Sequence, residues 1–209
     1  VVMVRTMRTK RPGEFPPMSV GAGFIWLVLG VLATAFMVLS TPFAELDMRA
    51  VTPVFVAGFL LQVLLGAMSY LLPQRMGGGP AVVRASNKEF SRFAAARVTV
   101  VNLSLIVFML PTTLTGSWVK VTVSAMGALG LASFLPCMVR GVKASVNTRK
   151  EMMAARARGE KPSFDGSGIQ PDPVNHTRHS LFGVLAVVLA LTLGIAVDPS
   201  SVGFNLMGG

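Results

Sequence analysis

The stretch Ser19–Ser40, SVGAGFIWLVLGVLATAFMVLS, contains no charged residue and decides the class of this protein. Its length of roughly 22 residues is enough for an α-helix to cross the hydrocarbon layer of a bilayer, which is about 30 Å thick. Prolines stand on both sides of it, at Pro16-Pro17 and at Pro42. Because proline disfavours the helix interior, these residues mark its expected ends. The stretch therefore predicts a membrane-spanning helix.

Four further stretches are long and predominantly apolar. They are Val51–Leu72, Val98–Leu114, Val119–Val139 and Leu181–Val197. Hydrophobic residues make up 52% of the chain and charged residues only 13%, whereas a soluble domain carries about 25% charged residues. We therefore expect an all-α integral membrane protein, a bundle of about five transmembrane helices.

The basic residues are distributed unequally between the two sides of this predicted bundle. The net charge is +10, and seventeen of the nineteen Lys and Arg residues fall in segments that would share one side. Only Arg49 and Lys120 fall on the other. Since basic residues stay in the cytoplasm, the pattern predicts that the N-terminus lies inside and the C-terminus outside.

The same pattern divides the chain into five segments. They are a basic cytoplasmic N-terminal segment (1–18), a four-helix membrane region (19–139), a basic cytoplasmic loop (140–180), a fifth transmembrane helix (181–198) and an outside tail (199–209). The stretch 81–97 alternates basic and apolar residues, which is typical of a short amphipathic helix at the membrane interface. Because the chain begins Val1-Val2-Met3, we expect it to be part of a longer polypeptide.

The positive charge also indicates the partners of the inner face. The basic residues lie in short loops without interleaved aromatic residues, which argues against nucleic acid as a partner. Anionic lipids on the cytoplasmic face of the membrane explain them better. Beyond the lipid bilayer, we expect other membrane helices or respiratory subunits as partners.

Ionisable residues are missing from the interiors of the five predicted spans, which bears on function. Such residues mark ion and proton pathways in membrane proteins, so their absence argues against a transporter, a pump or a haem held within this chain. The deepest polar residues are Gln62, Ser69, Tyr70, Asn102 and Ser104. Hydrogen bonds between helices are their favoured role, and contact with a quinone or substrate is the alternative.

Metal sites find little support in the sequence. His176 and His179, three residues apart, would share one helical face and are weak candidates for metal ligands. Two histidines do not complete a tetrahedral site, and no acidic residue or cysteine stands beside them. The thirteen methionines are scattered, so flexible apolar packing is their expected role. We therefore predict no catalytic site and no cofactor within this chain.

Small residues indicate where helices approach one another. Ala186, Ala190 and Gly194 recur every four residues along the fifth span. Such a stripe allows close contact between membrane helices. We therefore expect the fifth span to pack against another helix.

The second span and the loop after it carry a distinctive pattern. Residues 62–85 read QVLLGAMSYLLPQRMGGGPAVVRA. The distinctive positions are Gly66, Ser69, Tyr70, Pro73, Gly77, Gly78, Gly79 and Pro80. The pattern resembles the polytopic membrane region of actinobacterial-type multicopper oxidase or copper nitrite reductase-like proteins, and the weaker similarity covers most of the chain.

This resemblance implies a membrane region that precedes copper-binding cupredoxin domains outside the membrane. The cupredoxin ligand set of His, Cys and Met is missing from these residues, so copper would belong to an attached or partner domain. The resemblance thus implies a scaffold that positions an extracytoplasmic copper redox module. The alternative is a non-catalytic subunit of a haem-containing respiratory membrane complex, and a transporter or channel is the weakest candidate.

Overall fold

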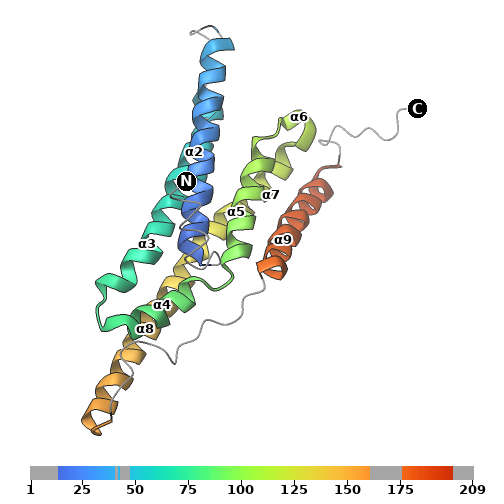
Figure 1. The fold of residues 1–209 in the computed structure, drawn as a ribbon. Coiled ribbons are helices and arrows are strands. Elements are labelled where there is room, and N and C mark those ends of the chain that lie inside the picture. The colour runs from blue at the N-terminus through green and yellow to red at the C-terminus, as the bar shows by residue number, and fades with distance from the viewer. Residues whose placement is uncertain (1–13, 41, 43–47, 161–175, 200–209) are drawn as a thin grey trace.

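Helices form every regular element in the part of the chain that the structure describes. The computed structural model describes residues 14–40, 42, 48–160 and 176–199. In chain order the elements are α2 (Phe15–Ser40), the 3-10 helix η2 (Met48–Ala50), the π-helix η3 (Val54–Leu60), α3 (Leu61–Arg75), α4 (Gly79–Phe90), α5 (Ala94–Met109), α6 (Thr112–Thr115), α7 (Ser117–Ala132), α8 (Phe134–Ala157) and α9 (His176–Val197). Figure 1 shows them as an elongated bundle. The all-α prediction is confirmed for these residues.

Four helical units are long and apolar enough to cross a membrane. They are Phe15–Ser40, Val54–Arg75, Ser117–Ala157 and His176–Val197. A fifth unit consists of α4 and α5, which meet at a bend of 44° and pass the same test together. The prediction of about five spans is therefore confirmed as four to five helices of sufficient length and hydrophobicity.

The helix α5 lies at the centre of the bundle. It packs against α7 and α9, while α2 packs against η3 and α3, and α4 packs against α8. Three clusters of buried apolar side chains stabilise these contacts. Their members are Phe15, Phe90, Ala94 and Phe134 in the first, Trp26, Val54 and Leu105 in the second, and Val119, Val123 and Ala190 in the third.

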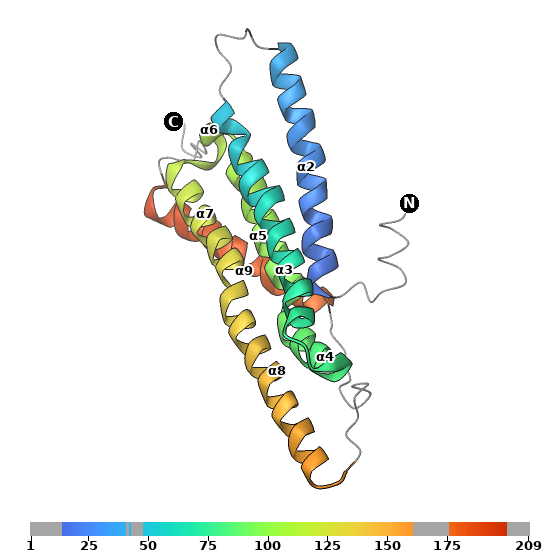
Figure 2. The same cartoon turned by 90° about the vertical axis from the view of Figure 1, so that its left-hand side faces the viewer.

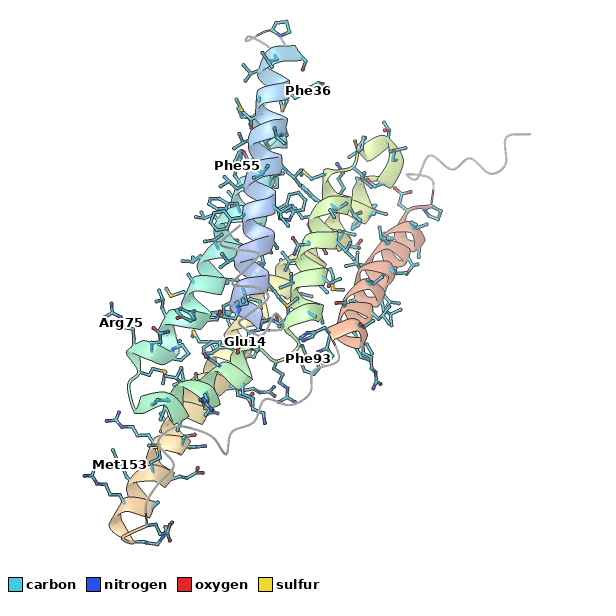
Figure 3. All side chains as sticks on the ribbon, viewed as in Figure 1. Glu14, Phe36, Phe55, Arg75, Phe93 and Met153 are labelled. Carbon is cyan, nitrogen blue, oxygen red and sulfur yellow. The ribbon has the colours of Figure 1, made fainter. Side chains whose placement is uncertain are left out.

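The two ends of the bundle differ in which chain segments they carry. The start of α2, the end of α3, all of α4 and the end of α8 lie at one end, as Figures 1 and 2 show. The end of α2, the short α6 and the end of α9 lie at the other. In Figure 3, Arg75 and Met153 mark the first end and Phe36 marks the second. We call them the basic end and the neutral end.

Several helix boundaries differ from the predicted ones, and the first and last spans are longer. α2 begins at Phe15 rather than Ser19, because Pro16 and Pro17 occupy its first turn, where a missing N–H does little harm. α9 begins at His176 rather than Leu181. The predicted loop 140–180 is therefore helical at both ends, and residues 161–175 lie outside the described part of the chain.

Prolines set the boundaries of the middle spans. The third span ends at Met109 rather than Leu114, since Leu110 precedes Pro111 and takes an extended conformation with ψ 149°. The fourth span does not end at Val139. It breaks at Ser133 and continues as α8 to Ala157. Pro136 explains the break, because it has no N–H to donate to the preceding turn.

The stretch 81–97 is helical, but it is divided between two helices. α4 covers its first part and ends before Phe93, which takes a left-handed conformation with φ 53°. The apolar side of α4 packs on α8. There the hydroxyl of Ser86 donates to the carbonyl of Gly141 (3.2 Å), and Phe90 is fully buried. The amphipathic pattern thus reflects contact between two helices.

Candidate functional site

A cluster of polar side chains joins α2, α3 and α5 in the interior of the bundle. Trp26 Nε1 donates to Asn102 Oδ1 (2.6 Å). The amides of Asn102 and Gln62 exchange two hydrogen bonds, Gln62 Nε2 to Asn102 Oδ1 (3.2 Å) and Asn102 Nδ2 to Gln62 Oε1 (3.3 Å). We call Trp26, Gln62 and Asn102 the amide cluster. It links one residue from each of three helices.

Backbone carbonyls complete the amide cluster. Gln62 Nε2 also donates to the carbonyl of Gly58 (2.9 Å), and Asn102 Nδ2 donates to that of Val98 (2.6 Å). On the other side of Gln62, its own carbonyl accepts a bond from the Ser19 hydroxyl (2.7 Å). All N–H groups of the three side chains are therefore used.

The π-helix η3 brings this arrangement about. Gly58 lies in η3, and a Cβ at Gly58 would stand 2.8 Å from Trp26 Cγ. Only glycine therefore allows the indole to lie against this turn and reach Asn102. π-helical turns are rare and occur frequently where a side chain has a special task. Here that task is the placement of Trp26 and Gln62.

A buried arginine lies nearer the basic end, between the same helices and α8. Arg97 is only 7% exposed. Its Nε donates to Ser133 Oγ (3.0 Å) and its Nη1 to the carbonyl of Phe90 (3.1 Å). Its Cζ lies 4.0 Å from the centroid of the Phe15 ring. A cation over an aromatic face is attracted by the electrons of the ring. We call these residues the Arg97 cage.

Arg97 corrects an expectation from the sequence. Its position at the end of the basic stretch 81–97 predicts a place outside the third span, but α5 begins at Ala94 and includes it. No salt bridge to Arg97 occurs among the described residues. Its charge is balanced by carbonyl, hydroxyl and ring contacts. The residue therefore belongs to the bundle interior.

The space between the amide cluster and the Arg97 cage is small. Ser19, Gln62 and Arg97 share a cavity of about 10 Å³ with apolar neighbours. A single water needs a volume of about this size, so the cavity excludes an organic ligand. The two clusters can hold helices together, but they offer no room for a substrate.

The other predicted polar residues take separate places. Ser69 is buried and donates to the carbonyl of Gly66 in its own helix (2.8 Å). The side chain of Tyr70 points away from the interior and is 51% exposed. Of the intramembrane polar contacts expected for Gln62, Tyr70 and Asn102, the structure brings only Gln62 and Asn102 together.

The distinctive residues of the 62–85 pattern lie in α3, in the turn that leads from α3 to α4, and at the start of α4. Gly66 faces α2, where a Cβ would stand 2.7 Å from Val20 Cγ2. Pro73 lies inside α3. The three glycines that follow all have positive φ, with Gly77 at 66°, Gly78 at 98° and Gly79 at 84°. Pro80 opens α4. The pattern thus provides a close contact between helices and a left-handed turn.

The two histidines occupy the first turn of α9. His176 is exposed, and the ring of His179 packs on Phe93 with centroids 5.1 Å apart. Figure 3 shows Phe93 where the bend between α4 and α5 meets the start of α9. Across the described residues, no group of three or more His, Cys, Asp or Glu side chains could hold a metal ion. The contact that the structure shows for the ring of His179 is the ring of Phe93.

The small-residue stripe of α9 faces α5 and α7. Ala190 and Gly194 are buried and Ala186 is half-buried. Gly183 extends the stripe by one turn. The predicted stripe does not include it, although it lies three residues before Ala186 and so shares the same helical face. A Cβ at Gly183 would stand 2.7 Å from the carbonyl oxygen of Ala96, and one at Gly194 would stand 2.6 Å from Val119 Cα. Helix contact at this distance tolerates no side chain.

A pair of charged side chains with shifted pKa values lies just after α8. Among the described residues outside the membrane-spanning segments, it is the one such pair. Arg158 donates to both carboxylate oxygens of Glu160, at 2.9 and 3.0 Å. These bonds lower the pKa of Glu160 and raise the pKa of Arg158. Both groups are fully exposed, so the pair contributes little to stability.

Comparison with known proteins adds no family to this description. The chain matches no protein-family model, no curated protein and no solved structure.

Proposed function

We propose that this chain is a multi-pass scaffold of the bacterial cytoplasmic membrane, with its N-terminus inside and its C-terminus outside. The observation that carries the proposal is the charge difference between the two ends of the bundle. Among the described residues, Arg49 and Lys120 are the only cations of the neutral end. Apart from Arg97 in the bundle interior, the remaining ones belong to the basic end, where Arg140, Lys143, Arg149 and Lys150 lie exposed along α8. Such asymmetry orients membrane proteins.

The interior of the bundle supports a scaffold rather than an enzyme. The polar groups of the amide cluster and the Arg97 cage are occupied by contacts between helices. Small residues let α9 approach α5 and α7. These features fix the helices relative to one another, which is what a scaffold requires.

The basic end would meet anionic lipids. Arg75 and Arg140 are exposed there, and each cation near an anionic surface gains about 1 kcal/mol. The C-terminal end of α9 would lie on the opposite side of the membrane. A module attached to this end or bound beside it would therefore stand outside the cytoplasm.

The resemblance described above suggests that this module is a copper redox domain. The test is to purify the full-length gene product with its partners from the native membrane in mild detergent, and to measure copper and haem. Stoichiometric copper that stays with the chain would support the proposal. Stoichiometric haem without copper would replace it with the respiratory-subunit alternative, and a chain with neither metal group would end the redox assignment.

A further inference from the structure

A second, larger cavity lies between η3, α5 and α7. Its volume is about 190 Å³, and its lining includes Ala57, Ser104, Phe108, Ser124, Gly127 and Ala128. Small residues on η3 and α7 leave this space. Ser124 and Ala128 are exposed, so the cavity opens toward the side that would face lipid. An apolar protein cavity of about 150 Å³ accommodates benzene, and this one therefore has room for a six-membered ring.

The hydroxyl of Ser104 distinguishes this cavity from a simple packing defect. Ser104 is only 2% exposed, and its Oγ has no hydrogen-bond partner. By contrast, the hydroxyl of Thr122 donates to the carbonyl of Ala190 on α9 (2.8 Å), and that of Ser124 donates to the carbonyl of Val121 in its own helix (2.9 Å). An unsatisfied buried hydroxyl costs about 1–3 kcal/mol. A partner in the cavity would remove this cost.

The remaining walls are suited to an apolar ring. Ala57 lies in the π-helix η3 and Pro53 directly precedes it, and Phe108 supplies an aromatic side chain. A lipid acyl chain would fill the apolar volume but would leave Ser104 without a partner. A ring that carries a carbonyl oxygen satisfies both requirements.

We propose that this cavity binds the ring of a lipid-soluble carbonyl compound of the quinone class, with the hydroxyl of Ser104 donating to a carbonyl oxygen. The ligand reaches the cavity from the bilayer, past Ser124 and Ala128. The site is separate from the amide cluster and the Arg97 cage, and it does not depend on the proposed scaffold function.

The test uses the full chain in lipid nanodiscs and two probes of similar shape, decyl-1,4-benzoquinone and decylbenzene. The quinone is expected to bind saturably at one site per chain, measured by equilibrium dialysis. Ser104→Ala removes one hydrogen bond and should weaken quinone binding about threefold to tenfold. Binding of decylbenzene, which carries no carbonyl, should not change. Equal quinone binding by the wild type and Ser104→Ala would overturn the role of Ser104.

A second variant fills the cavity itself. Ala128→Leu places an apolar side chain at its mouth and should abolish saturable binding of the quinone. The matched control is Ala125→Leu, which is exposed on the same helix but outside the cavity lining. It should bind like the wild type. The proposal fails if both probes merely partition linearly into the nanodiscs, or if the two leucine variants behave alike.

Discussion

At the scale of single residues, the sequence identifies which polar groups matter but not how they pair. Gln62 and Asn102 stand out as amides in apolar spans, and the structure joins them. Trp26 was not assigned to a site. Its indole N–H needs an acceptor when it is buried, and the few polar residues of the spans are the available acceptors. Asn102 becomes the acceptor because the π-helical turn at Gly58 lets the indole lie close to it. No sequence pattern predicts that turn.

Replacing Asn102 with leucine tests the amide cluster. Asn102→Leu keeps the side-chain volume roughly constant but leaves the indole N–H of Trp26 and one N–H of Gln62 without partners. The free energy of unfolding should fall by about 1–3 kcal/mol, measured by titration with a denaturing detergent. Tyr70→Phe is the control, because this exposed hydroxyl lies outside the cluster. Equal stability of Asn102→Leu and Tyr70→Phe would contradict the account.

The Arg97 cage makes a second prediction at this scale. Its two hydrogen bonds and its stacking on Phe15 require a planar fork that lysine lacks. We expect Arg97→Lys to lower the free energy of unfolding by about 1–3 kcal/mol, although the charge is kept. The same detergent titration measures it, and Lys143→Arg at an exposed position is the control. A lysine variant as stable as the wild type would show that only the charge matters.

At the scale of elements, apolar runs reveal the spans, but local backbone chemistry sets their ends. Pro111 and Pro136 explain why the third span is shorter and the fourth is broken, and both signals are present in the sequence. The bend at Phe93 is different. A phenylalanine with positive φ is uncommon, so the sequence predicts one helix over 81–97, where the structure has the end of α4 and the start of α5. The packing of α4 on α8 accounts for the interruption.

Replacing a glycine of α9 tests its close packing against α5. Gly183→Ala would place a Cβ against the carbonyl oxygen of Ala96 and push α9 away from α5. Overpacking of this kind costs about 1–3 kcal/mol, which should appear as a lower melting temperature in detergent. Leu189→Ala, at a position that is 58% exposed, is the control and should melt like the wild type. A melting temperature unchanged by Gly183→Ala would rule out this close contact.

The end of α8 carries a pH prediction. The pKa of Glu160 is lowered by its bonds from Arg158. The pair is therefore intact above the unfolded-state pKa and is lost as the pH falls through the lowered value. An NMR titration should show the Glu160 carboxyl titrating below a free glutamate, and Arg158→Ala should return it to the ordinary range. Identical titrations in both proteins would show that the pair does not form in solution.

At the scale of the whole molecule, the charge distribution and the fold agree on two distinct ends. The sequence predicts which segments share a side of the bundle. In the structure, the helix ends that carry most of the basic residues lie together at one end. Which end faces the cytoplasm follows from the positive-inside rule, so orientation is the central claim. The lone cysteine, Cys137, makes this claim testable, because Cys137→Ser gives a background without thiols.

The decisive measurement places a single cysteine at each end and labels it with a maleimide that does not cross membranes. Thr113→Cys, exposed in α6, reports the neutral end, and Glu151→Cys, exposed in α8, reports the basic end. In intact bacterial cells we predict labelling of Thr113→Cys alone, with Glu151→Cys labelled only after the membrane is opened. The reverse pattern, or labelling of both cysteines in intact cells, would contradict the account.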